Sequence, residues 1–257
     1  NPLENVDKYI LIAVGLLGCI SLLMLESTVY DNGLVLARPV LVQAIAYALG
    51  FAILLFLQKI DYRFFIGLEK FLYIAAILLL LTVYIPGLGE EQYGSRAWIN
   101  LGVTTLQPSE FVKILFVLIM AGYLSEHREE LTRFTGVFKA FLVAAPIIAI
   151  VLKEDLGSAL VFIVMWIFMV FFAGIDYKLF FQCALACLAA IPIIYKLLDA
   201  YQKERIEAFL HPNNLSLSGN YQVWQSKVAI GSGGFTGKGL FHGTQKNLDF
   251  IPVQQSD

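Results

Sequence analysis

The sequence predicts an all-α polytopic membrane protein with about seven transmembrane helices and one large extracytoplasmic loop. Of its 257 residues, 58% are hydrophobic and only 15% are charged, whereas soluble domains carry about 25% charged residues. The mean hydropathy is +0.73. The apolar residues fall into repeated long runs, and a membrane-spanning helix needs about 17 to 25 mostly apolar residues. Composition and run length together predict a chain that crosses the bilayer several times.

Seven apolar segments qualify as spanning helices. In chain order they are Tyr9–Leu25, Pro39–Leu57, Phe71–Ile85, Ser109–Leu124, Val137–Leu152, Gly157–Ile175 and Leu179–Leu198. Pro146 and Pro192 fall inside the fifth and seventh segments. Neighbouring helices in a membrane can satisfy the carbonyl groups that proline leaves unbonded. Both prolines are therefore predicted to kink their helices without ending them.

Lys and Arg in the short loops favour a cytoplasmic N-terminus. In that orientation the cytoplasmic segments carry Lys8, Lys59, Arg63, Lys70, Arg128, Arg133, Lys139 and Lys178, and the short outer loops carry only Arg38, Arg96 and Lys153. Residues 1–199, with seven spans, then place residues 200–257 outside the cell as one loop. The whole chain is predicted to form a single membrane domain.

Residues 200–257 form the one long non-apolar stretch of the chain. A loop of this length without apolar periodicity is uncommon unless it is functional or disordered. The loop contains aromatic and leucine residues throughout, so we expect a folded, functional loop. Its glycines at 231, 233 and 234 predict tight turns and close backbone approach. A P-loop, Gly-x-x-x-x-Gly-Lys-Ser/Thr, is excluded. When Gly237-Lys238 is aligned with its Gly-Lys pair, Ser232 occupies the position of the first Gly and Gly239 the position of the Ser or Thr.

Other composition features exclude further classes of protein. The net charge is −2 and no basic patch is present, so we predict no nucleic-acid partner. The three cysteines, Cys19, Cys183 and Cys187, lie in apolar runs. They lack the second pair that a zinc site needs and are most simply packing residues.

Ionisable residues at membrane depth are costly and mark candidate functional sites. Glu110 and Lys113 lie three residues apart on one predicted helix and can pair. The alternative role is a structural ion pair near the helix end. Ser109 follows Pro108 at the predicted start of that helix, so it could serve only as the helix cap.

Two outer loops carry further candidates. Arg96 stands near Trp98, and a guanidinium group can bind phosphate in a bidentate manner at the level of the lipid headgroups; the alternative is an ordinary interfacial anchor. Asp155 separates the fifth and sixth spans. On its own, it reads most simply as a solvated loop acid.

Several motifs occur in one order between residues 93 and 257. They are Gly94-Ser-Arg96-Ala-Trp98, Gln107-Pro-Ser-Glu110 with Lys113, Asp155-Leu-Gly157-Ser158, Arg205, Phe209-Leu-His-Pro212, Tyr221-Gln222, Ser226, Ala229-Ile-Gly-Ser-Gly-Gly234, Gly237-Lys-Gly239, Gly243, Ile251-Pro252 and Ser256-Asp257. In this order they resemble the SEDS family of membrane glycosyltransferases, and its RodA-like elongation branch more closely than its FtsW-like division branch. Two departures are that Val253 replaces a usual Glu and Ser256 a usual Thr.

The resemblance implies about ten helices, so the last three are expected to lie beyond residue 257. It also implies that lipid II is polymerised into peptidoglycan strands during cell elongation, with inversion at the sugar. Asp257 is expected to be the general base, ranked above Asp155, Lys113, Glu110 and Arg96. Substrate contacts are expected from Arg96, Trp98, Gln107, Ser109, Gly231, Gly233, Gly234 and Lys238.

The resemblance further implies the surroundings of the site. The protein is expected in the bacterial cytoplasmic (inner) membrane, with its site on the extracytoplasmic side. Magnesium or manganese could neutralise the pyrophosphate leaving group, no organic cofactor is expected, and the metal's identity is open. Expected partners are lipid II, undecaprenyl-linked glycan, membrane lipids and a class B penicillin-binding transpeptidase. Two other functions stay open, a lipid II flippase and a non-catalytic scaffold for a penicillin-binding protein.

Overall fold

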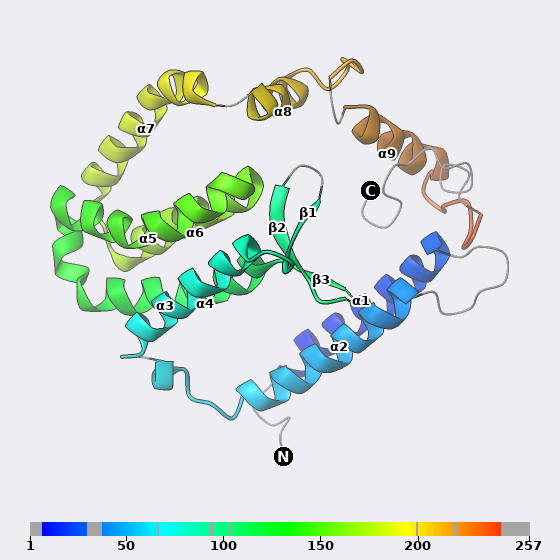
Figure 1. The fold of residues 1–257 in the computed structure, drawn as a ribbon, viewed down its shortest axis with the longest axis horizontal. Coiled ribbons are helices and arrows are strands. Elements are labelled where there is room, and N and C mark those ends of the chain that lie inside the picture. Colours follow the sequence, from blue (N-terminus) through cyan, green and yellow to red (C-terminus); the bar gives the residue numbers. More distant parts are fainter. Residues whose placement is uncertain are drawn as a thin grey trace. The chain divides into compact units, whose positions relative to one another are not determined.

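The computed structural model describes residues 7–29, 38–65, 67–92, 95–102, 104–198, 200–217 and 220–242. The chain divides into two compact units. One unit is Tyr62–Leu197, and the other combines Asn1–Asp61 with Leu198–Asp257. Each unit is described by itself (Figure 1).

The core of the unit Tyr62–Leu197 is a bundle of four α-helices with a small sheet at one end, and a fifth helix follows them in the chain (Figure 1). The helices are α3 (Glu69–Leu81), α4 (Pro108–Glu126), α5 (Phe134–Glu154), α6 (Leu156–Ala173) and α7 (Tyr177–Leu197). Pro108 is the first residue of α4, where its missing N–H costs nothing. Gly174 ends α6 with a φ of 103°, a left-handed conformation that glycine adopts without steric cost.

The core of this unit mixes large and small side chains. Phe116 of α4 and Phe162 of α6 are fully buried and meet edge to face, with ring centroids 5.2 Å apart. Four fully buried alanines lie on three helices, α3, α5 and α6, and allow the backbones to approach closely, as in many membrane bundles. They are Ala76, Ala140, Ala144 and Ala159.

A three-stranded antiparallel sheet lies between α3 and α4 in the chain. Its strands are β1 (Gly89–Gln92), β2 (Ser95–Asn100) and β3 (Thr105–Leu106), with β2 in the centre. Side chains alternate between the two faces of a strand. Ile99 is buried and Ala97 lines a small cavity with residues of α4 and α5, so this face of β2 packs on the helices. Arg96 and Trp98 belong to the other face.

The second unit contains the other long helices and the C-terminal region. Helices α1 (Lys8–Val29) and α2 (Arg38–Leu57) lie side by side (Figure 1). Helices α8 (Ala200–Leu210) and α9 (Asn220–Gly233) follow later in the chain. The amide of Phe241 donates a hydrogen bond of 3.0 Å to the hydroxyl of Ser27, which ties this region to α1.

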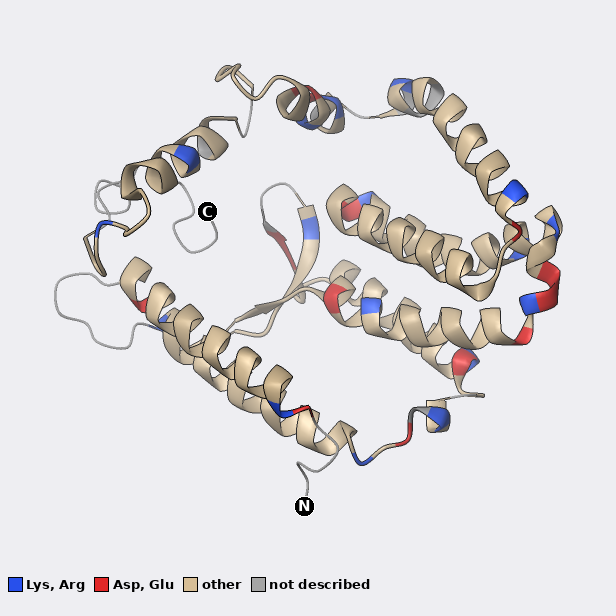
Figure 2. Cartoon of the chain, turned by 180° about the vertical axis from the view of Figure 1, so that it is seen from behind, with Lys and Arg blue, Asp and Glu red and all other residues tan. Residues whose placement is uncertain are grey.

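All seven predicted spans are helical, and five of the described helices are long and apolar enough to cross a membrane: α1, α2, α4, α5 and α6. Charged residues gather at the ends of α4, α5 and α6 and leave the helix middles apolar (Figure 2). The third prediction was too long, because α3 ends at Leu81 and gives way to the 3₁₀ helix η2 (Thr82–Tyr84). Pro86 disfavours a helical conformation at the residue before it, and Ile85 is extended, with a ψ of 125°.

Two loop predictions need correction. The segment before α4 contains the three-stranded sheet, and residues 200–242 contain α8 and α9. The glycines at 231 and 233 lie inside α9 rather than in turns, whereas Gly234, directly after the helix, has a φ of 55°. Only Gly234 of these three therefore has the left-handed backbone of the predicted turns.

Candidate active site at the turn between α5 and α6

A group of polar residues lies where the sheet meets the turn between α5 and α6. A single residue, Asp155, joins the two helices in an extended conformation with a φ of −143° and a ψ of 103°. It ends α5 and caps α6. We call this group the Asp155 cluster; it consists of Tyr84, Ser95, Arg96, Gln107, Lys153, Glu154, Asp155 and Ser158.

The carboxylate of Asp155 accepts hydrogen bonds from three donors. The amide of Gly157 donates to Oδ1 over 2.9 Å, and the hydroxyl of Ser158 donates to Oδ2 over 2.6 Å. The side-chain amide of Gln107 also donates to Oδ2, over 3.3 Å. The carboxylate thus caps α6 and lies next to the positive end of the helix dipole, where an acceptor is favourable. The predicted residues Gln107 and Asp155 are thus brought into contact.

Glu154 connects the sheet to the end of α5. Its Oε1 accepts from the hydroxyl of Tyr84 over 2.7 Å, and its Oε2 accepts from the backbone amide of Arg96 over 3.2 Å. Its carbonyl accepts from the hydroxyl of Ser95 over 2.6 Å. The amine of Lys153 lies 4.6 Å from the ring centroid of Tyr84, in the range of a cation–π contact. Neither Glu154 nor Tyr84 was predicted from the sequence as a site residue.

Arg96 and Trp98 lie on β2, on the face opposite to Ala97 and Ile99, and both are half-buried. Trp98 pairs with Glu90 across β1 and β2. The Arg96 side chain crosses β1 at Gly89, where an added Cβ would lie 3.1 Å from its Nε and would also overlap the carbonyl group of Val83. Glycine at this position therefore lets both β1 and the arginine side chain lie close to η2.

The predicted pair of Glu110 and Lys113 is present near the start of α4. The amine of Lys113 lies 2.7 Å from Oε1 of Glu110, and the side chains are 25% and 54% exposed, respectively. Because the pair is accessible, its amine and carboxylate can reach a bound polar group. Exposed pairs of this kind add little stability, typically less than about 1 kcal/mol.

Ser109 is buried in the first turn of α4 and does not cap the helix. Gln107 is the N-cap residue, and Ser109 has 6% of its surface exposed. Its hydroxyl oxygen is buried and has no hydrogen-bond partner among the described residues. It borders a small cavity shared with Pro108, Glu154 and Asp155. The expectation that Ser109 caps the helix was wrong, because Gln107 is the cap and Pro108 begins the helix, and its role as a substrate contact stays a prediction.

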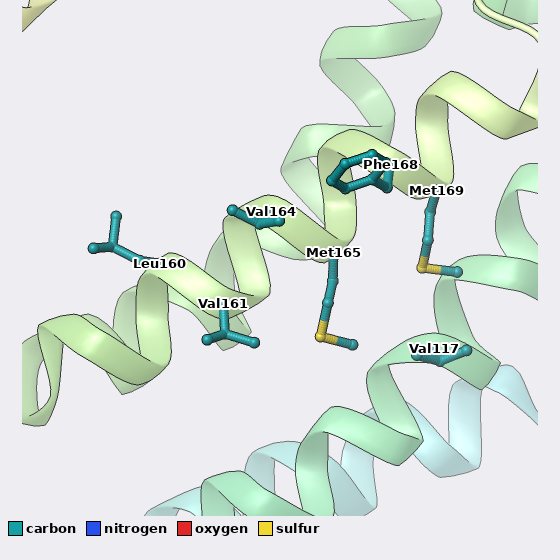
Figure 3. Close-up of a pocket in the computed structure, with 7 residues that line it drawn as sticks. All are labelled: Val117, Leu160, Val161, Val164, Met165, Phe168 and Met169. Carbon is teal, nitrogen blue, oxygen red and sulfur yellow. The ribbon is translucent and has the colours of Figure 1, made fainter. Parts of the chain in front are cut away.

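An apolar groove runs along α6 beside α4 (Figure 3). Its volume is about 440 Å³. Met165 and Met169 extend from α6 towards Val117 of α4 (Figure 3). The side chains that line the groove are all hydrocarbon or thioether: Val117, Leu160, Val161, Val164, Met165, Phe168 and Met169.

The remaining predicted site residues are not part of this cluster. Gly231, Gly233, Gly234 and Lys238 belong to the other unit. Asp257 lies outside the described residues. Among the residues that the structure describes, no three His, Cys, Asp or Glu side chains form a group that could hold a metal ion.

Comparison with known proteins identifies the family. Residues 7–257 match the family model FTSW_RODA_SPOVE, described as a cell cycle protein. The chain belongs to this FtsW, RodA and SpoVE family. It is therefore a multi-pass membrane protein, in agreement with its five long apolar helices. The resemblance to the SEDS family is confirmed.

Individual relatives add detail. The chain is 32% identical over 212 residues to the peptidoglycan glycosyltransferase MrdB of Escherichia coli K12. The matched region covers 82% of this chain and 56% of MrdB. The chain thus spans about half the length of that relative. This chain also resembles a chain of a solved peptidoglycan synthase complex, whose structure is described as coordinating polymerisation and crosslinking. The TM-score is 0.72 and the identity is 29%, and the match covers 90% of this chain and 67% of the other chain. RodA of Thermus thermophilus shares the fold, with a TM-score of 0.58 and 23% identity over 98% of this chain and 88% of RodA.

Proposed function

We propose that the full-length protein is a peptidoglycan glycosyltransferase that polymerises lipid II during cell elongation. The observation that carries this proposal is the Asp155 cluster, which places carboxylates and cations at the end of an apolar helix bundle in a chain of the FtsW, RodA and SpoVE family. The name of the relative MrdB supports the activity. The basic residues of the short loops support an inner-membrane protein with a cytoplasmic N-terminus and an extracytoplasmic site.

The reaction needs a base and a source of positive charge. The 4-hydroxyl of the acceptor sugar loses its proton as its oxygen attacks the anomeric carbon of the donor, and the bond to undecaprenyl pyrophosphate breaks. We assign the proton transfer to the carboxylate of Asp257. Attack from the face opposite the leaving group inverts the linkage from α to β.

Charge develops on the pyrophosphate as it leaves. Arg96 and Lys113 can stabilise that charge, since guanidinium and ammonium groups bind phosphate oxygens. Magnesium or manganese bound with the substrate would add positive charge. Among the described residues, no group of acids fits such an ion.

The apolar groove is the proposed place of the undecaprenyl tail. Val117 follows Lys113 by four residues on α4, so both lie on the same side of the helix, one turn apart. On α6 the lining residues run from Leu160, just after Ser158, to Met169. These nine steps cover about 14 Å, roughly half of the hydrocarbon core of a bilayer. A lipid with its anionic headgroup near Lys113 could therefore lay its tail in the groove.

A class B penicillin-binding transpeptidase is the proposed protein partner, beside undecaprenyl-linked glycan and membrane lipids. The resemblance to a chain of a complex described by both polymerisation and crosslinking supports this partner. Such a partner would crosslink the strands that this protein makes.

The test uses the full-length protein in liposomes with labelled lipid II. Wild type and Asp257→Asn are compared, products are separated by length, and Glu129→Gln, an exposed change in the α4–α5 connection, serves as the control. We expect long strands from wild type and control and none from folded Asp257→Asn. Equal polymer from Asp257→Asn would refute its role as base and move attention to Asp155.

The same experiment separates the alternative functions. Polymer from none of the proteins, even with the transpeptidase partner added, would refute the glycosyltransferase. Movement of labelled lipid II between leaflets would then favour the flippase, which the ionisable pair Glu110 and Lys113 also fits. Activity only of the partner would favour the scaffold.

A further inference from the structure

We infer that Glu154 is a positioning residue that fastens β2, and with it Arg96, to the end of α5 beside Asp155. It takes no part in the chemistry. Its two carboxylate oxygens and its carbonyl accept from three separate donors: the hydroxyl of Tyr84 in η2, the backbone amide of Arg96 and the hydroxyl of Ser95. The part of this inference that concerns activity rests on the proposed function.

The contacts join segments that are far apart in the chain. Tyr84 and Glu154 are separated by 70 residues, and Arg96 and Glu154 by 58. The sheet is small, with strands of four, six and two residues, and a sheet of this size is only marginally stable by itself. Hydrogen bonds to a charged carboxylate are about twice as strong as neutral ones. Glu154 is thus a strong link between this sheet and the helix that presents Asp155.

The geometry distinguishes positioning from catalysis. Each carboxylate oxygen of Glu154 already accepts a hydrogen bond from the protein, Oε1 from Tyr84 and Oε2 from the amide of Arg96. A glutamine can still accept from Tyr84 through its own oxygen, but its NH₂ group would face the Arg96 amide, another donor. Glu154→Gln therefore keeps the hydrogen bond from Tyr84 and loses the one from the Arg96 amide, whereas Glu154→Ala keeps only the bond from Ser95 to the backbone carbonyl.

The first measurement is the polymerisation kinetics of the full-length protein in liposomes. Glu154→Ala loses both carboxylate hydrogen bonds. We expect it to lower kcat/KM for lipid II about tenfold, while the pH profile of kcat stays unchanged. Glu154→Gln and Tyr84→Phe should give smaller losses. Glu129→Ala, an exposed change in the connection between α4 and α5, is the matched control. A kcat loss as large in Glu154→Gln as in Glu154→Ala, or a shifted pH profile, would show a chemical role and overturn the inference.

A double-mutant cycle tests the link to Arg96. If Glu154 acts by positioning Arg96, then Arg96→Ala should reduce the rate of polymerisation by a smaller factor in the Glu154→Ala background than in wild type. Fully additive effects would overturn the inference, because they would mean that the two residues act independently.

Hydrogen exchange provides a readout that does not depend on activity. Peptides that cover residues 95–100 should exchange faster in Glu154→Ala than in wild type or Glu129→Ala. Unchanged exchange would overturn the inference whatever the kinetics show. If wild type forms no polymer, the proposed function fails, and hydrogen exchange still decides whether Glu154 fastens the strand.

Discussion

Replacing Asp155 tests how the α5–α6 turn is built. In Asp155→Ala, α6 loses its N-cap acceptor for the amide of Gly157, and the side chains of Ser158 and Gln107 lose a shared acceptor. Loss of a cap costs about 1 kcal/mol, and the two partly buried side-chain bonds together add about 1 kcal/mol more, because water replaces part of them. The free energy of unfolding should fall by about 2 kcal/mol.

Asp155→Asn should behave differently. Asparagine is as good an N-cap as aspartate, so the bond from the Gly157 amide persists. Only the charge at the positive end of the helix dipole is lost, which costs about 0.3 to 1 kcal/mol. Polymerisation should fall in both variants if the carboxylate acts on the substrate, and the asparagine variant then separates that role from the cap.

Thermal unfolding of the full-length protein in one detergent measures the difference. About 2 kcal/mol corresponds to a Tm lower by about 4 to 8 °C for Asp155→Ala, with at most half of that for Asp155→Asn. Asp176 is a matched control, because its Oδ1 accepts from the amides of Lys178 and Leu179 at the start of α7, away from the cluster. Equal losses in Asp155→Ala and Asp155→Asn would refute the capping argument.

Two further substitutions test the sheet and the core. Gly89→Ala should displace β1, because the new methyl group would overlap the carbonyl of Val83. The free energy of unfolding should fall by about 1 to 3 kcal/mol, and hydrogen exchange in β1 and β2 should become faster. Unchanged exchange would contradict the packing described. Phe162→Ala removes a fully buried ring that meets Phe116. It should lower the free energy of unfolding by about 3 to 5 kcal/mol, measured by unfolding the protein in a denaturing detergent of increasing concentration. A change below about 1 kcal/mol would contradict the described packing of Phe162 in the core.

The helices of the membrane bundle were predictable because run length alone identifies them. Each of the seven predicted segments coincides with a helix, and most ends agree within a few residues. The error at Ile85 has a local cause, since the proline that follows disfavours helical geometry there. Apolar residues continue past the end of α3, so hydropathy alone could not locate it.

The sheet and the C-terminal helices were missed because their signals are weak. β1 reads Gly-Glu-Glu-Gln and β3 has two residues, so neither shows the alternation that identifies a strand. Helix α8 carries Lys203, Glu204, Arg205 and Glu207 among its apolar residues, and a search for membrane spans passes over it. The sheet depends on its contacts with η2, α4 and α5 more than on local pattern.

The candidate site was predictable in its motifs but not in its connections. The sequence identified Gln107 and Asp155 separately, and the structure shows their side chains in contact. Glu154 is adjacent to Asp155 in the sequence, but two neighbouring acidic residues usually indicate a solvated loop rather than a site. Its partners Tyr84 and Ser95 lie about 60 to 70 residues away, and only the fold brings them together.

The most direct test of the proposed function is the release of undecaprenyl pyrophosphate from lipid II. Each glycosidic bond formed must free one undecaprenyl pyrophosphate, so the full-length protein in liposomes should release it in step with strand growth, and Asp257→Asn should release none. Transfer of lipid II across the bilayer without release of pyrophosphate would contradict the glycosyltransferase and favour a transporter.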